Sequence, residues 1–232
     1  MAVRRLAAPA LQPKSFAFSA DNLAWAEKEI TKYPAGRQAS AAIALLWRAQ
    51  AQSGGWLPEA AIRYVADFLS MAHIRVLEIA TFYTMFNLEP VGRFYVQVCG
   101  TTPCMLRGAE DLKDLCRKRI GEPGRVSADG MFSWTEVECL GACVNAPMLQ
   151  INEDNYEDLN SEILSRIFDD LAAGRTPKTG PQIDRQYSAP LGGPTTLTTL
   201  GRGTSAGKTG AAADRETPSQ NAGGAHPARS EV

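Results

Sequence analysis

The sequence has almost no net charge and no long apolar run, and both absences exclude classes of protein. Its 24 basic and 25 acidic residues give a formal net charge of -1, so it lacks the positive excess that attracts nucleic acid or an anionic membrane. No stretch reaches the roughly 20 apolar residues that a membrane-spanning helix requires. Pro9 and Pro13 interrupt anything that could serve as the apolar core of an export signal. We therefore expect a protein that is not exported, has no membrane span and binds no nucleic acid.

Histidine is nearly absent, and the few cysteines do not suit a disulfide framework. His73 and His226 are far apart and isolated from the cysteines, so we expect neither to be a metal ligand. The five cysteines are an odd number in a chain with no recognisable export signal, which favours a reducing compartment. In that setting clustered thiols more often bind metal or do redox chemistry.

Four short amphipathic segments between residues 16 and 88 predict a small helical bundle. Their apolar residues recur every three or four positions, which places them on one face of a helix. The first segment begins near Ser19, whose hydroxyl can accept a hydrogen bond from a free N–H, and the third has Pro58 near its first turn. The second and fourth begin near Gln38 and His73. Because the connections are short, we expect residues 16–88 to form one helical domain.

After residue 88 the pattern changes to mixed strands and helices. Aromatic and β-branched residues favour strands, whereas two later segments repeat their apolar residues at helical spacing. The expected strands are 94–99, 131–139, 148–152 and 155–159, and the expected helices are 109–121 and 161–174. We therefore expect a compact α/β domain over residues 89–175 and, together with the bundle, an α+β fold.

From residue 176 onward the chain is rich in Pro, Gly, Ser, Thr and Ala and has almost no large apolar residue. Such a segment cannot bury enough apolar surface to offset the entropy lost on ordering. We therefore expect residues 176–232 to form an extended or disordered tail, with disorder beyond Pro190.

Four cysteines stand in two pairs at the ends of predicted strands. Cys99 ends one strand, and Cys104 lies in the expected first turn of a helix, where free N–H groups favour a thiolate. Cys139 ends another strand, and Cys143 follows it around a short turn. Strand ends of one sheet can lie side by side, so the fold can bring the four sulfurs together although 34 residues separate the pairs.

Four thiols can serve several kinds of site. Structural zinc most often takes cysteine pairs separated by two to four residues, so the spacings of these pairs do not exclude it. A [2Fe-2S] cluster is anionic and needs backbone N–H groups near its sulfurs, and the small residues in "CGTTPC" and "CLGAC" allow such an approach. A dithiol redox pair is disfavoured because no C-x-x-C is present. The residues favour an iron–sulfur cluster and leave the other two open, while Cys116, at core spacing on a helix, is expected to be buried.

The two cysteine loops and their surroundings resemble a known family. "VQVCGTTPCMLRG" and "EVECLGACVNAPMLQIN", with "IATFYTMFNLEPVG" before them and "YEDLN" after them, closely resemble the small iron–sulfur subunit of the NADH dehydrogenase module of respiratory complex I. The resemblance spans about residues 16–187. It implies a helical N-terminal part and a thioredoxin-like domain in which Cys99, Cys104, Cys139 and Cys143 bind one [2Fe-2S] cluster.

The resemblance also implies a setting for the chain. It is similar to an electron-transfer subunit of proton-pumping NADH:quinone oxidoreductase, peripheral on the cytoplasmic face of a bacterial inner membrane. Its partners would be a subunit that holds FMN and NADH and an adjoining iron–sulfur subunit. No catalytic residue is expected, because the sequence has no glycine-rich dinucleotide fingerprint after a strand. The alternatives are the equivalent diaphorase subunit of an NAD-linked hydrogenase or formate dehydrogenase, and a zinc-stapled adaptor.

Overall fold

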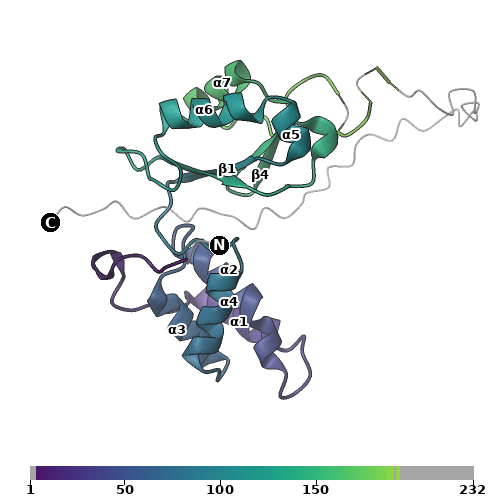
Figure 1. The fold of residues 1–232 in the computed structure, drawn as a ribbon. Helices are drawn as coiled ribbons and strands as arrows, with labels where there is room; N and C mark the ends of the chain where they lie inside the picture. Colours follow the sequence, from purple (N-terminus) through teal and green to yellow (C-terminus); the bar gives the residue numbers. More distant parts are fainter. Residues whose placement is uncertain (1–3, 186, 191, 194–232) are drawn as a thin grey trace, which may run out of the picture. The chain divides into compact units, whose positions relative to one another are not determined.

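Four α-helices make up the N-terminal part of the fold (Figure 1). The computed structural model describes residues 4–185, 187–190 and 192–193. Among these, the N-terminal elements are η1 (Pro9–Leu11), α1 (Ala20–Ile30), η2 (Gln38–Ala41), α2 (Ala42–Gln52), α3 (Glu59–Phe68) and α4 (His73–Phe82). The four predicted helices are confirmed.

The capping residues of these helices follow from the sequence. The Ser19 hydroxyl accepts a hydrogen bond of 3.3 Å from the Asn22 N–H and so satisfies a free donor at the start of α1. Pro58 stands immediately before α3. The helices bury one apolar core, in which Leu45, Ile62 and Val76 are inaccessible to solvent. Burial of these apolar faces supplies most of the helices' stability, since helices this short are marginal alone.

The remaining described residues alternate strands and helices. In chain order the elements are β1 (Phe94–Cys99), α5 (Thr102–Leu106), α6 (Ala109–Arg119), β2 (Phe132–Val137), η3 (Cys143–Asn145), β3 (Leu149–Ile151), β4 (Asp154–Glu157), α7 (Ser161–Ala172) and β5 (Gly180–Pro181). The strands and helices predicted in this part are confirmed, and together with the helical part they confirm the α+β fold.

The strands form one five-stranded sheet in the order β2-β1-β3-β4-β5. β1 runs parallel to β2 and antiparallel to β3, β3 and β4 are antiparallel, and β4 and β5 are parallel. In the register of the first two strands, Cys99 lies opposite Val137. The carboxyl ends of β1 and β2 therefore meet at the same edge of the sheet.

An apolar core joins the sheet to α6 and α7. Val96 and Val98 of β1 and Trp134 of β2 contribute to it from the sheet. Leu112 and Cys116 contribute from α6, and both are fully buried. Figure 1 shows α6 and α7 side by side over the sheet, and α6 contacts both β1 and α7. The prediction that Cys116 is a buried core residue is confirmed.

Most of the predicted tail lies outside the described residues. The expected disorder beyond residue 190 therefore stays a prediction, and so do the domain boundaries 16–88, 89–175 and 176–232. Within the described part, Gly180–Pro181 adds a short strand beside β4, which the composition of this segment does not indicate. No helix in the described ranges is long and apolar enough to cross a membrane.

Candidate metal centre

The four paired cysteines lie at the shared carboxyl ends of β1 and β2. Cys99 is the last residue of β1, and Cys104 lies within α5, three residues after that helix's N-cap at Thr101. Cys139 follows the end of β2 by two residues, slightly later than predicted, and Cys143 begins η3. Because β1 and β2 are parallel neighbours, the loops that leave them are adjacent. The structure thus brings together all four cysteines that the sequence singles out.

The second pair is exposed and in direct contact. The sulfurs of Cys139 and Cys143 are 3.4 Å apart, and the Gly141 N–H donates to the Cys139 sulfur at 3.4 Å. That backbone donor, followed by the hydrogen bond from Cys143, lowers the pKa of Cys139, and the same contact raises the pKa of Cys143. Gly141 has φ +90°, a conformation that other residues rarely adopt. The glycine therefore turns its own N–H toward the Cys139 sulfur.

The first pair is buried. Cys99 and Cys104 are each 1% exposed, and the Thr101 hydroxyl lies 3.4 Å from the Cys99 sulfur. Burial raises the pKa of Cys99, but the Thr101 hydroxyl and the backbone N–H groups of Thr101 and Leu140 outweigh it and leave the pKa lowered. Burial, and then the hydrogen bond with Cys99, raise the pKa of Cys104 to about 12. The Leu140 N–H belongs to the other loop, so the two pairs share one site.

The thiols fit a binuclear cluster held by two pairs. Among the described residues, no three His, Cys, Asp or Glu side chains converge so as to hold one metal ion. A [2Fe-2S] cluster makes a different demand, since each of its two irons takes two cysteine sulfurs. Backbone and hydroxyl donors to Cys99 and Cys139 also match the need of an anionic cluster for hydrogen bonds to its sulfurs. The donor set and its surroundings therefore suit such a cluster.

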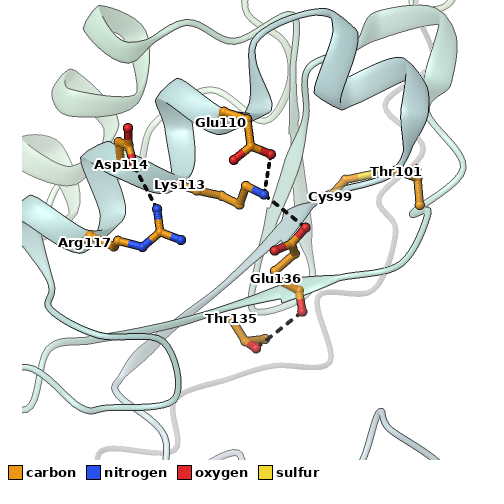
Figure 2. A network of polar contacts seen from close by, with 8 residues as sticks. All are labelled: Cys99, Thr101, Glu110, Lys113, Asp114, Arg117, Thr135 and Glu136. Atoms are coloured by element: carbon orange, nitrogen blue, oxygen red, sulfur yellow. Dashed lines mark hydrogen bonds and ion pairs between the residues drawn. The ribbon is translucent and has the colours of Figure 1, made fainter. Parts of the chain in front are cut away.

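A buried lysine lies behind the Cys99 loop (Figure 2). The Lys113 ammonium on α6 is 2.5 Å from a Glu110 carboxylate oxygen and 3.1 Å from one of Glu136 on β2, and its side chain is 7% exposed. The hydrogen bond to Glu110, helped by Glu136, raises the pKa of Lys113 against the opposing effect of burial. A Cβ on Gly100 would lie 1.9 Å from the Glu136 carboxylate, so that carboxylate covers the backbone next to Cys99. Lys113 therefore compensates a negative charge beside the site.

The sequence reasoning missed two side chains that hold the second loop. Asn145, at the end of η3, is 2% exposed, and its side chain accepts a hydrogen bond of 2.5 Å from Arg185. Asn145 lies within the second cysteine motif, but nothing in that motif distinguishes it from its neighbours, and Arg185 belongs to no motif or periodic apolar pattern. Of the two histidines, His73 lies on α4 and His226 lies outside the described residues.

Comparison with known proteins gives consistent matches. The thioredoxin-like [2Fe-2S] ferredoxin family matches residues 26–172. An E-type subunit of NADH-quinone oxidoreductase from Rhizobium meliloti (strain 1021) is 61% identical over 201 residues, which cover 85% of this chain and 73% of that protein. The E-type subunit from Rickettsia bellii (strain RML369-C) is 52% identical over 158 residues, which cover 68% and 95%. Among solved structures, an NAD+-reducing [NiFe]-hydrogenase in the H2-reduced state matches with a TM-score of 0.49 and 22% identity, over 57% of this chain and 22% of that chain.

The family match confirms the recognition drawn from the cysteine loops. It includes both cysteine pairs and the whole of the sheet up to β4, so the thioredoxin-like fold is confirmed with it. The relatives align over most of their own length and are named as subunits of an oxidoreductase. The chain therefore belongs to the thioredoxin-like [2Fe-2S] ferredoxin family and, within it, to the E-type subunits of NADH-quinone oxidoreductase.

Proposed function

We propose that the chain binds one [2Fe-2S] cluster through Cys99, Cys104, Cys139 and Cys143. The observation that carries the proposal is the gathering of two thiol pairs at one sheet edge, with the exposed pair in sulfur contact at 3.4 Å. Each pair would hold one iron: the buried pair, Cys99 and Cys104, lies toward the core, and the exposed pair, Cys139 and Cys143, lies toward solvent. The family match supports the choice of this cluster over zinc.

The cluster supplies one-electron transfer, and the chain supplies its ligands and their hydrogen bonds. Donors from Gly141 and Thr101 stabilise negative charge on the sulfurs of Cys139 and Cys99. No residue of the described part is assigned proton or hydride chemistry.

In the larger assembly, the chain acts as an electron-transfer subunit of proton-pumping NADH:quinone oxidoreductase. The names of the relatives support this role. FMN and NADH are bound by a partner subunit, and an adjoining iron–sulfur subunit lies nearby. In that assembly the chain lies peripherally on the cytoplasmic face of a bacterial inner membrane.

The ligand assignment is tested by iron and sulfide analysis of the anaerobically purified full chain, together with its visible spectrum and reduced-state paramagnetic resonance. Replacing any one of the four cysteines with Ala removes or severely destabilises the cluster, because one of the two irons then loses half of its protein ligands. Cys116→Ser is the matched control and keeps the spectrum, with some loss of stability. Normal iron content in Cys139→Ala would contradict the assignment, and a colourless protein with stoichiometric zinc would favour an adaptor.

The proposed role of the flavin-bearing partner subunit, which passes electrons from NADH to the cluster, gives a second test. A one-electron centre cannot accept a hydride, so NADH can reduce the cluster only after flavin has divided the electron pair. The cluster-loaded chain alone is therefore expected to keep its oxidised spectrum with NADH, and adding the flavin-bearing partner allows reduction if the cluster potential is high enough. Rapid bleaching by NADH in the demonstrated absence of flavin and other proteins would refute this role.

A further inference from the structure

The segment after α7 returns along the sheet to the second cysteine loop. β5 pairs with β4 so that Gly180 lies opposite Tyr156, and the Gln182 N–H donates to the Glu157 carbonyl at 3.0 Å. We call residues 180–185 the strap. Its pairing with β4 fixes where the strap ends, and Arg185 stands at that end.

Arg185 joins the strap to two other parts of the chain. Its Nη1 donates to the Asn145 side-chain oxygen at 2.5 Å and is 3.4 Å from the Val144 carbonyl. Its Nη2 lies 3.2 Å from a carboxylate oxygen of Asp158, and the side chains of this ion pair are only 9% and 5% exposed. A planar guanidinium can contact a carboxylate and two further acceptors at once, which a lysine ammonium cannot do in the same geometry. Arg185 therefore connects η3 to the residue that follows β4.

Asn145 has partners for all of its polar groups. Its side-chain N–H groups donate to Glu157 at 2.5 Å and to the Tyr187 carbonyl at 3.0 Å, and its oxygen accepts from Arg185. Its backbone carbonyl accepts from the Asp158 N–H at 2.7 Å, and its own N–H donates to the Ala142 carbonyl at 3.0 Å. Because Asn145 is two residues from Cys143 in the same 3-10 turn, fixing Asn145 also fixes the backbone of Cys143.

We propose that Arg185 is a positioning residue for the cluster: it acts through Asn145 to hold the Cys143 turn in the conformation that presents this thiol to iron. The proposal rests on the proposed function, in which Cys143 is a ligand. Cys139 and Cys143 are the exposed pair, so their loop lacks the burial that holds Cys99 and Cys104. The strap supplies the missing constraint by burying one ion pair and one amide beneath the turn.

The test uses full-length Arg185→Gln, with Arg175→Gln as the matched control. Arg175 also belongs to the segment after α7, and within the described part of the chain its guanidinium pairs with Asp170 of α7 and not with a residue of the cysteine loops. Two quantities are measured: amide hydrogen exchange at Ala146 and Asp158 in the reduced, metal-free chain, and the rate at which an iron chelator removes the cluster from the loaded chain. Arg185→Gln is expected to speed removal of the cluster by about tenfold or more, as loss of a residue supporting a metal ligand does, and to speed exchange at both amides. Arg175→Gln is expected to change neither.

A third measurement separates positioning from general stability. The paramagnetic resonance of the reduced cluster reports the geometry of its ligands, and it is expected to change in Arg185→Gln. A lower melting temperature with unchanged resonance and unchanged chelation rate would overturn the proposal. If Arg185→Gln does not fold, Arg185→Lys is measured instead. It keeps the positive charge beside Asp158 but lacks the second N–H group that reaches Asn145. The same three measurements then test the proposal.

The two proposals fail differently. If the strap inference is wrong, hydrogen exchange in Arg185→Gln matches that of the unaltered chain, while the four cysteine variants still lose iron. If the ligand assignment is wrong, the cysteine variants keep iron, while Arg185→Gln still speeds exchange in the metal-free chain.

Discussion

The Lys113 ammonium on α6 reaches across to the Glu136 carboxylate on β2, at 3.1 Å, from a position that is almost closed to solvent. The side chain of Lys113 is 7% exposed, whereas that of Glu136 is 49% exposed. Most of the free-energy cost of removing this ion pair from water therefore arises at the lysine. Glu136 covers the backbone of Gly100, next to Cys99. The pair therefore places one compensated charge directly behind the buried side of the cluster site (Figure 2).

Lys113→Met is expected to make the cluster harder to reduce. Removing the ammonium leaves the carboxylates of Glu110 and Glu136 uncompensated beside a site that gains negative charge on reduction. The midpoint potential should fall by on the order of tens of millivolts, as Coulomb interaction at an effective dielectric near 20 implies. The free energy of unfolding should fall by about 1–2 kcal/mol, because both carboxylates are half exposed and can be solvated.

The control for this variant is Lys118→Met. It removes the same charge from an exposed position on the same helix, where water and salt screen it. Potentials are measured by redox titration followed by paramagnetic resonance. Equal shifts in the two variants would contradict a specific role for Lys113.

Two glycines are expected to respond differently to substitution by alanine. A Cβ on Gly92 would lie 2.4 Å from the backbone carbon of Phe132, and this backbone cannot move without disturbing β2. Gly92→Ala should therefore destabilise the fold by about 3 kcal/mol or more, or prevent folding. At Gly100 the clashing group is the end of the Glu136 side chain, which can rotate away, so Gly100→Ala should lower the free energy of unfolding by only about 1 kcal/mol. Urea denaturation compares the two, and a reversed order would show that the β2 backbone yields more easily than the side chain.

Cys116 is expected to make stability fall with alkaline pH. Burial raises the pKa of its thiol to about 12, above the value of about 8.5 for an unfolded thiol. As the pH rises past the lower value, the unfolded chain loses this proton first, so the free energy of unfolding falls until the pH reaches the folded pKa. By about pH 9.5 the loss from this one group is about 1.4 kcal/mol.

Cys116→Ala removes that contribution while keeping the other four cysteines. The difference between the two proteins in free energy of unfolding is measured by denaturation at a series of pH values. It should shrink as the pH rises above about 8.5, because only the unaltered chain carries the penalty. A difference that stays constant up to about pH 10.5 would mean that the Cys116 thiol ionises in the folded protein as it does in the unfolded one.

Removing residues 191–232 is expected to change neither the melting temperature nor the cluster content. This segment has almost no large apolar side chains and so cannot add to a packed core. Melting is followed by circular dichroism and the cluster by its visible spectrum. A large drop in either quantity would show that the segment stabilises the rest of the chain.

Local patterns predicted the four N-terminal helices, the strands β1 to β4 and the helices α6 and α7, and they predicted that the fold can bring the four cysteines together. Strand periodicity ended at Cys99 and close to Cys139, and parallel neighbouring strands bring their ends together whatever lies between them. Cys116 was predicted as a core residue because helical spacing placed it on the buried face of α6.

The residues that support the site could not be predicted in the same way. Arg185 meets Asn145 across 40 residues of sequence, and an arginine in a segment rich in small and polar residues carries no sign of burial. Lys113 lies in a helix with many charged residues, and only the approach of β2 distinguishes it from its exposed neighbours. Such contacts depend on how distant elements meet, which periodicity and spacing do not encode.

The contrast between the two thiol pairs also bears on how the metal enters and leaves the folded chain. Cys99 and Cys104 are closed off beneath the loops, whereas Cys139 and Cys143 stand open. A molecule in solution therefore contacts the sulfurs of Cys139 and Cys143 before those of Cys99 and Cys104. In the proposed cluster, the bonds to Cys139 and Cys143 would therefore be the ones most open to oxidants and chelators, so the outer loop would limit the lifetime of the centre.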